Sequence, residues 1–284
     1  MSDPLYFKKF NMRSIPIYNK YAESDGKIIV FTGGRGSGKT RLVIDFLYHH
    51  RDVPYVVCFS PTESLTSTFK PHIPQVFTHY AYSSNKLKNV LHRQRMLIDK
   101  IRDDPKYKDY DPRVILIFDD CMKDKILARD PIISEIFLNG RHFRITVLIT
   151  MQYVLGILPS LRSNIDYAFM MYDSRKVTLK KLHDNYASVI ENYGTFRRIF
   201  SSTTQHYRAM VIDFGVKSNT INDCVFWYKS CLHHDFRMCP TSLWKYNDII
   251  YKRRKESEYE QMINDNQEEM NTTKDRNDIV LIHE

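Results

Sequence analysis

The sequence predicts a three-layer α/β/α fold around a mainly parallel central sheet. Short apolar runs typical of strands alternate along the chain with segments whose apolar residues recur at helical spacing. One run, residues 114–118, is apolar at every position, as expected of a strand buried on both faces. The 284 residues, 43% of them hydrophobic, suffice for one large α/β domain with appendages.

The predicted elements follow one another from residue 27 onward. Residues 39–49 form a helix because their apolar side chains share one face, and residues 85–102 show the same spacing over a longer segment. A further helix begins after Asp130, a residue type that caps helix N-termini, and ends before Gly140. The predicted strands are residues 27–32, 55–60, 114–118, 145–150, 167–172, 209–213 and 224–227.

One domain is expected over residues 25–250, with a C-terminal elaboration. Residues 1–24 are polar, carry charges throughout and lack the apolar core of a signal sequence, so they are interpreted as an irregular N-terminal extension. Residues 251–284 predict a charged helix followed by a disordered tail, since Asn, Asp, Glu and Thr dominate beyond residue 264.

Net charge and cysteine content restrict the class of protein. The formal net charge is +9, which favours an acidic polymer as partner, and nucleic acid is the usual one. The 5 cysteines are scattered and odd in number, which argues against a disulfide framework and favours a reducing compartment. No apolar stretch is long enough to span a bilayer, so we expect a soluble intracellular protein.

A phosphate-binding loop follows the first predicted strand. The P-loop pattern is complete in Gly33, Gly34, Arg35, Gly36, Ser37, Gly38, Lys39 and Thr40. Glycines let backbone N–H groups face a phosphate, and the N-terminus of the following helix presents further donors. We expect Lys39 to contact the β- and γ-phosphates of ATP and Thr40 to bind Mg²⁺.

Two acidic residues, Asp119 and Asp120, follow the apolar run at 114–118. An acid at this strand end holds Mg²⁺ in P-loop proteins, which predicts that role for Asp119. A second acid separates ATP-hydrolysing motors from kinases and GTPases that have a similar loop. Asp120 is therefore the candidate to orient or deprotonate the attacking water.

Gln152 and Arg141 flank the predicted strand over residues 145–150. In additional-strand P-loop ATPases this strand lies between the phosphate-loop strand and the acidic strand, so Gln152 at its tip would face the γ-phosphate. Arg141 precedes the strand and is a candidate arginine finger for the active site of a neighbouring subunit. Arg144 and Arg162 are rival candidates for the same role.

Taken together, these motifs resemble the genome-packaging ATPases of poxviruses and other nucleocytoplasmic large DNA viruses, within the FtsK–HerA superfamily. The resemblance covers roughly residues 26–172, and residues 158–166 also look family-like. Its most specific part is Asp-Asp-Cys at 119–121 combined with Gly-Arg-His at 140–142. The wider superfamily usually has Asp-Glu where this chain has Asp-Asp, so the shorter acid must approach the water differently.

The resemblance implies a RecA-like ATPase that forms a homo-oligomeric ring and moves double-stranded DNA into a capsid, using ATP and Mg²⁺. It carries over the nucleotide, Mg²⁺, catalytic-acid, sensor and trans-finger roles to Lys39, Thr40, Asp119, Asp120, Gln152 and Arg141. It also implies capsid or virion assembly proteins as partners and a location at the viral assembly site in the host cytoplasm or in the virion. The alternatives are a HerA-like helicase or translocase in repair or segregation, and a non-catalytic virion core protein.

Two further groups of residues have more than one interpretation. Basic residues cluster in the helix over 85–102, at 175–181 and at 197–198, and each cluster is either a solvated face or a contact for DNA phosphates. Four residues near the end of the domain suggest zinc, but their spacing matches no standard zinc module, so ordinary buried or surface side chains are the default. These four are Cys231, His233, His234 and Cys239.

Overall fold

The computed structural model describes residues 6–17, 26–121, 129–218 and 220–253. The chain divides into two compact units, Met1–Cys239 and Pro240–Glu284. In the second unit residues 241–253 are helical, and the predicted tail lies outside the described residues. Within the described part of the chain, no helix combines the length and the apolar character needed to cross a membrane. The first unit contains the sheet and all the predicted site residues.

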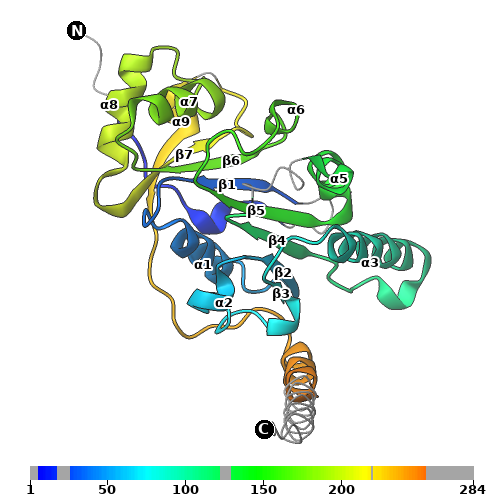
Figure 1. The fold of residues 1–284 in the computed structure, drawn as a ribbon. Coiled ribbons are helices and arrows are strands. Elements are labelled where there is room, and N and C mark those ends of the chain that lie inside the picture. Colours follow the sequence, from blue (N-terminus) through cyan, green and yellow to red (C-terminus); the bar gives the residue numbers. More distant parts are fainter. Residues whose placement is uncertain (1–5, 18–25, 122–128, 219, 254–284) are drawn as a thin grey trace, which may run out of the picture. The chain divides into compact units, whose positions relative to one another are not determined.

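Among the described residues, eight strands form one sheet in the order β3-β2-β4-β5-β1-β6-β7-β8 (Figure 1). The strands are β1 (Ile28–Thr32), β2 (Tyr55–Phe59), β3 (Thr78–His79), β4 (Val114–Asp119), β5 (Ile145–Met151), β6 (Tyr167–Met171), β7 (Arg208–Asp213) and β8 (Val225–Lys229). From β3 to β6 in this order all neighbours are parallel, whereas β7 and β8 pair antiparallel. The parallel strands therefore share one carboxyl edge, where ligands bind in α/β sheets.

Strand β5 occupies the centre of the parallel part, between β1 and β4. All seven of its residues are buried, and most are β-branched, which suits a strand packed on both faces. Thr150, near its end, is in register with Phe31 of β1 and with Asp119 of β4. The end of β5 thus lies between the phosphate loop and the acidic step, by which we mean Asp119 and Asp120. This is the arrangement predicted for the additional-strand class.

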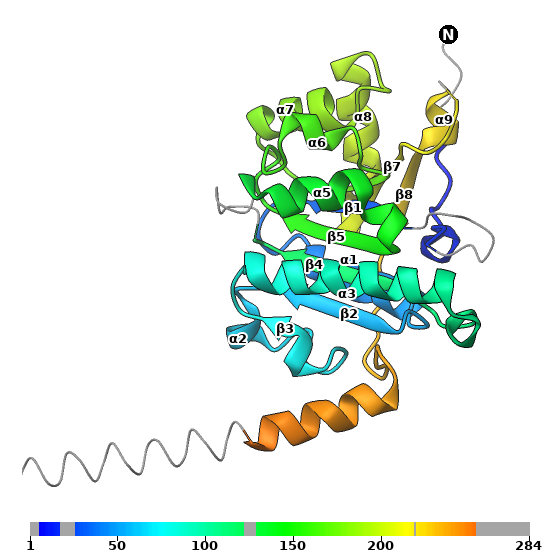
Figure 2. The same cartoon turned by 90° about the vertical axis from the view of Figure 1, so that its right-hand side faces the viewer.

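In the described part of the chain, five helices cover one face of the sheet, the face turned toward the viewer in Figure 2. They are α3 (Ser84–Asp103), α5 (Pro131–Asn139), α6 (Pro159–Arg162), α7 (Lys176–Tyr186) and α8 (Tyr193–Thr203). Their apolar sides interlock with alternate residues of the strands, for example Leu91 of α3 and Phe196 of α8. Asp130 caps α5 as predicted, because its side chain accepts a hydrogen bond from the N–H of Ile132 at 2.9 Å.

The opposite face is covered by α1 (Lys39–His49) and by two segments that contain no α-helix, residues 10–17 and 236–238. Phe10 is buried and its N–H donates to the carbonyl of Trp227 at 2.8 Å, which lies in β8. Met12, in the short turn Met12–Ser14, is also buried. Described residues of the predicted N-terminal extension are therefore part of the core of the first unit.

The mainly parallel three-layer fold is confirmed, and several smaller elements were not predicted. These are β3, helices α2 (Glu63–Thr66), α6, α7, α8 and α9 (Ile221–Cys224), and the antiparallel direction of β7 and β8. Strand β3 has only two residues, too few for a periodic pattern, and pairs with Cys58 and Phe59. The direction of an apolar run is not visible in its own residues, because it depends on how the chain returns to the sheet.

Candidate active site

The phosphate loop connects β1 to α1 at the carboxyl edge of the sheet. Gly36 and Gly38 have φ values of 72° and 100°, in the left-handed region that favours glycine. Gly33 is needed for a different reason: a Cβ there would lie 2.7 Å from Ser37 Oγ and 2.9 Å from Met171 Cβ. The loop conformation therefore depends on glycine at several of the positions that the motif specifies.

Lys39 is the first residue of α1 and is buried under the loop. Its Nζ donates to the carbonyl oxygens of Gly33 at 3.0 Å and Gly34 at 2.8 Å. These bonds hold the ammonium group inside the turn of the loop, beside the backbone N–H groups at the start of α1. A buried cation at a helix N-terminus is the electrostatic feature that a polyphosphate requires.

Asp119, the last residue of β4, is fixed by hydroxyl groups from the neighbouring strands. Thr150 Oγ1 donates to Oδ1 at 2.8 Å and Ser60 Oγ donates to Oδ2 at 2.9 Å. Thr40, the predicted Mg²⁺ ligand, places its Oγ1 3.4 Å from Asp119 Oδ1. The structure thus brings Thr40 and Asp119 together, as the motifs predict, and fixes the orientation of the carboxylate.

Asp120 follows in a left-handed conformation with φ 53°, which costs a non-glycine residue about 1–3 kcal/mol. Two contacts hold this conformation. The N–H of Asp120 donates to Thr150 Oγ1 at 2.9 Å, and Gln152 Nε2 donates to Asp120 Oδ2 at 2.6 Å. The strained backbone turns Asp120 away from the direction of β4 and toward Gln152. Strain of this kind is typical of functional sites.

The donor set at this edge fits Mg²⁺ and a nucleotide. Carboxylate and hydroxyl oxygens are the ligands that Mg²⁺ prefers, and Asp119 and Thr40 supply one of each. Lys39 and the glycine-rich backbone supply positive charge and N–H donors for phosphates. Thr40 and Asp119 would hold the ion, directly or through its water shell.

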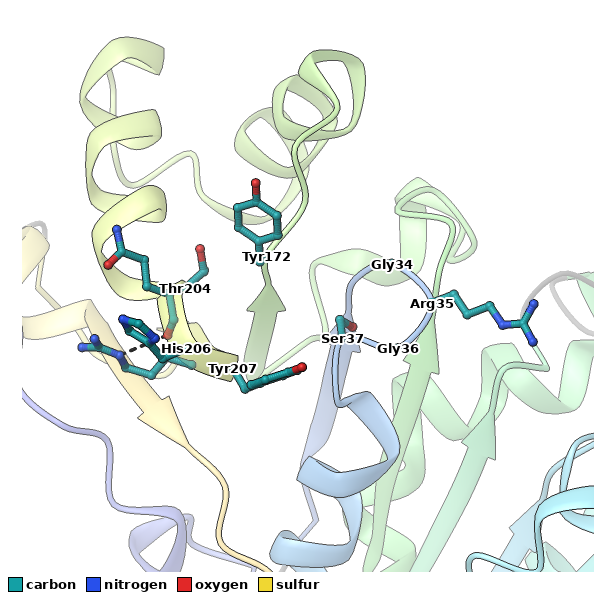
Figure 3. A pocket seen from close by; sticks show the side chains of 10 residues that line it. Gly34, Arg35, Gly36, Ser37, Tyr172, Thr204, His206 and Tyr207 are labelled. Carbon is teal, nitrogen blue, oxygen red and sulfur yellow. Dashed lines mark hydrogen bonds between the residues drawn. The ribbon is translucent and has the colours of Figure 1, made fainter.

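An open pocket of about 520 Å³ adjoins the phosphate loop. Its lining consists of Gly34, Arg35, Gly36, Ser37, Tyr172, Thr204, Gln205, His206, Tyr207 and Arg208. Figure 3 shows Tyr172 and Tyr207 across the opening from the loop, with the ring of Tyr207 directed toward the loop and Arg35 pointing away. The two tyrosines are 59% and 75% exposed, so their rings are available to a planar ligand.

Sequence reasoning missed several residues of this site. Tyr172 and Tyr207 carry no motif, and the turn between α8 and β7 brings Tyr207 to the loop from a distant part of the chain. Ser60 and Thr150 were also missed, although both lie at strand ends. Aligning the carboxyl ends of the predicted parallel strands would have indicated them, because such ends share one edge of the sheet.

Arg141 lies apart from the other predicted site residues of its own chain. It belongs to the short turn Gly140–Phe143 before β5, at the amino edge of the parallel strands, and its side chain is exposed. Within the described residues it forms no ion pair with an acid. Arg162 is held internally, because its Nε donates to the carbonyl of Ile157 at 3.0 Å and its Nη1 contacts Asn185. Arg144 is half-buried with φ 58°.

Comparison with known proteins identifies the family of this chain. Residues 17–238 match the family described as Poxvirus A32 protein. Protein L437 of Acanthamoeba polyphaga mimivirus is 41% identical over 204 residues, which cover 71% of this chain and 72% of that protein. Protein 088R of Invertebrate iridescent virus 3 is 33% identical over 206 residues, which cover 72% of this chain and 76% of that protein.

A solved structure shares the fold. The genome packaging NTPase B204 from Sulfolobus turreted icosahedral virus 2, in complex with AMP, aligns with a TM-score of 0.51 at 17% identity. The alignment covers 73% of this chain and 98% of that chain. The two proteins therefore share the fold.

Proposed function

Because the chain belongs to the poxvirus A32 protein family, we propose that it is an ATPase that moves double-stranded DNA into a viral capsid. The complete phosphate loop, the acidic step and the homology support the nucleotide chemistry. The basic net charge of +9 supports a nucleic-acid partner. Capsid or virion assembly proteins as partners, and action at the assembly site in the host cytoplasm or in the virion, belong to the same proposal.

The arrangement around the end of β5 is the observation that carries the proposal. Thr150 bonds to both acidic residues of the step, and Gln152 bonds to the second of them. ATP hydrolysis by a motor needs a water positioned in line with the γ-phosphate and a group that accepts a hydrogen bond from it. Asp120, aimed by Gln152, is the group that takes this role in our proposal.

The other residues of the site have electrostatic roles. Lys39 stabilises negative charge on the β- and γ-phosphates. Mg²⁺ held by Thr40 and Asp119 would supply further neutralisation of phosphate charge. Tyr172 and Tyr207 offer flat apolar surfaces beside the loop, which suit the base of the nucleotide.

The location of Arg141 supports a homo-oligomer. It is exposed at the amino edge of the parallel strands, whereas the phosphate loop lies at the carboxyl edge. An arginine finger in this position can complete only the active site of another subunit. A ring of subunits, each placing Arg141 against the phosphate loop of the next, satisfies this requirement.

Helix α8 is the best candidate for the DNA contact. Arg197 and Arg198 are exposed, and within the described residues neither forms an ion pair with an acid. Both line an open depression of about 460 Å³ that also includes Gln205. Gln205 lines the pocket at the phosphate loop as well, so the depression beside Arg197 and Arg198 adjoins the nucleotide pocket. Basic side chains on this helix can bind phosphates of any DNA sequence.

The basic residues of α3 support the solvated-face interpretation instead. Arg102 bonds to Asp99 and to Asp103, each at 2.9 Å. Arg95 contacts Glu135 of α5. Cations engaged by neighbouring acids attract DNA phosphates less strongly than cations without such partners.

The test is ATP hydrolysis by the purified chain with and without double-stranded DNA, beside a Lys39→Ala variant. We expect turnover that duplex DNA stimulates and that the variant lacks. A strand-separation assay on the same preparation tests the helicase alternative, because a packaging motor has no need to unwind its substrate. If an assembled oligomer hydrolyses ATP at the same rate with and without duplex DNA, the translocase part of the proposal is contradicted.

A further inference from the structure

Three potential metal ligands meet beside α1, in the layer that covers the sheet face opposite to α3 and α5. They are Asp45 and His49, one helical turn apart on α1, and His233 from the segment after β8. The ligand atoms of the three side chains all lie within 4.8 Å of one another. Asp45 Oδ1 is 2.6 Å from His233 Nε2 and 3.6 Å from His49 Nε2.

Asp45 needs compensation for its charge because it is fully buried, with 0% of its surface exposed. Within the described part of the chain, its ion-pair partners are the two histidines alone, and it pairs with no Lys or Arg. Tyr228 donates its hydroxyl to Asp45 Oδ2 at 2.6 Å, which orients the carboxylate without neutralising it. A buried carboxylate beside two imidazoles is a ligand set that a metal cation can occupy.

The ring nitrogens of His49 and His233 are potential metal ligands. A neutral imidazole has a free nitrogen lone pair for a metal ion. His49 also lines an open pocket of about 720 Å³, which gives an ion a path from solvent to the cluster. His233 is held in place by stacking on Tyr48, with ring centroids 3.6 Å apart.

We propose that Asp45, His49 and His233 bind one Zn²⁺ ion. Two imidazole nitrogens and one carboxylate oxygen are a ligand set that zinc takes in proteins, with a water in the fourth position. Tyr228 would then orient the ligand Asp45 through its hydrogen bond without contacting the ion, as residues next to metal ligands commonly do. Zinc ligands lie about 2.0–2.2 Å from the ion, so entry of the ion requires His233 and Asp45 to separate slightly from their direct hydrogen bond.

Only one of the four residues that suggested zinc in the sequence belongs to this cluster. Cys239 is not among the ligands, and burial raises the pKa of its thiol to about 11, which disfavours the thiolate that binds metal. Cys231 and His234 are exposed. The other two ligands come from a helix far earlier in the sequence, which is why spacing alone could not identify the site.

The ion would join two parts of the first unit. Asp45 and His49 belong to the helix that begins with Lys39, and His233 belongs to the segment that leads away from β8. Zinc would therefore clamp this segment to the helix that carries the phosphate-binding lysine. The inference does not depend on the proposed DNA packaging, because it concerns metal binding alone.

The experiment is zinc binding by the full chain, measured as bound zinc per chain after dialysis and as the shift of melting temperature on adding Zn²⁺ or EDTA. We expect about one zinc per chain, a higher melting temperature with Zn²⁺ and a lower one with EDTA. His49→Ala should lose both the bound zinc and the shift. This variant suits the test because His49 is only 3.6 Å from one atom of Asp45 and makes no close hydrogen bond to it, so the apo fold should persist.

His92→Ala is the matched control, since His92 is an exposed histidine on α3, distant in sequence from the cluster. It should bind zinc as the wild type does. His233→Ala should also lose zinc, but it removes a hydrogen bond to Asp45 as well, so it is read only together with His49→Ala. Equal zinc content in His49→Ala and in His92→Ala, or a wild type without zinc and without a melting shift, would leave a hydrogen-bonded cluster and overturn the proposal.

Discussion

Thr150 joins the two acidic residues of the active site through one hydroxyl group. Its Oγ1 donates to Asp119 Oδ1 at 2.8 Å and accepts from the N–H of Asp120 at 2.9 Å. Each hydroxyl has one proton and two lone pairs, so both bonds form at once. The orientation of Asp119, the proposed Mg²⁺ ligand, and the left-handed backbone of Asp120 therefore depend on the same threonine hydroxyl.

Thr150→Val should keep the shape of the side chain and remove both bonds. We expect ATPase activity, or the affinity for Mg²⁺ that supports it, to fall by about 10–100-fold, as for other partners of metal ligands. Thr146→Val is the matched control, because Thr146 is a buried threonine earlier on the same strand. Steady-state ATPase measured against Mg²⁺ concentration separates the two variants, and equal loss in both would refute a specific role for Thr150.

At this scale, the sequence predicts residues whose role is encoded locally. Lys39, Thr40 and Asp119 come together as expected, because their motifs also fix the strand and helix that carry them. The contact between Gln152 and Asp120 required more, namely that β5 lies next to β4. The additional-strand pattern predicted that these two strands are neighbours. No pattern predicted that Tyr207 lies beside the phosphate loop, because its position depends on the path of the chain after α8.

The N-terminal segment and α1 meet at a buried histidine. His50 directly follows α1, and its Nε2 donates to the carbonyl of Met12 at 3.1 Å. Burial lowers the pKa of His50 to about 4, with smaller opposing effects from Asp52 and from this hydrogen bond. The native state thus keeps the ring neutral at a pH where the unfolded chain has begun to protonate it.

This shift predicts how stability depends on pH. Above about pH 6.5 the ring is neutral in both states and contributes nothing to the slope. As the pH falls from about 6.5 to about 4, the unfolded state binds the proton first, so stability decreases, by on the order of 3 kcal/mol at most from this group. Urea unfolding at several pH values in this window tests the expectation.

His50→Gln is the informative variant, because its amide can still donate to Met12 while it cannot titrate. Other groups titrate in the same window, including His49, but they are present in both proteins. The wild type should lose more stability than His50→Gln between pH 6.5 and pH 4. Parallel profiles would show that His50 is protonated as easily in the native state as in the unfolded one.

The extent of most elements could be predicted, and the links between them could not. Helix α1 has the predicted bounds, and strands β1 to β6, apart from β3, end within one residue of the prediction. Periodicity and capping residues such as Asp130 determine these limits locally. The direction of β7 and the docking of Phe10 against β8 depend on contacts between distant residues, which one sequence does not display.

For the whole molecule, the two exposed arginines of α8 offer a test of DNA binding. The double change Arg197→Ala and Arg198→Ala should reduce the stimulation of ATPase by duplex DNA and weaken the salt dependence of DNA binding, since fewer phosphates are neutralised. Turnover without DNA should stay near that of the wild type. The measurements are DNA titrations of ATPase activity and binding at two salt concentrations.

Arg102→Ala on α3 is the comparison for this pair, because Arg102 is exposed but engaged by Asp99 and Asp103. It should leave stimulation by DNA almost unchanged. If Arg102→Ala weakens DNA binding as much as the double variant does, the DNA path runs over α3 and the assignment to α8 is wrong.

An active site shared between subunits makes a further prediction about mixtures. Arg141→Ala and Lys39→Ala should each be inactive when purified alone, because every site lacks one component. In a mixed oligomer, Arg141 of a Lys39→Ala subunit can complete the intact phosphate loop of an Arg141→Ala neighbour. ATPase activity should therefore return on mixing. Mixed assemblies, verified by size and by labelled subunits, that stay inactive would exclude the shared site with Arg141, as would full activity of Arg141→Ala alone.

Strand β5 has a mechanical consequence. It is hydrogen-bonded along both sides, buried over its full length and about 20 Å long, with Gln152 just past one end and the Arg141 turn just before the other. Because a strand of this kind is stiff, a displacement at one of its ends is transmitted to the other end with little loss. In the proposed ring, loss of the γ-phosphate next to Gln152 would displace this end of β5. The Arg141 turn, which would face the next subunit, would then move by a comparable amount. Neighbouring subunits would then hydrolyse ATP one after another rather than independently. The movement of β5, rather than of a flexible segment, would set the timing.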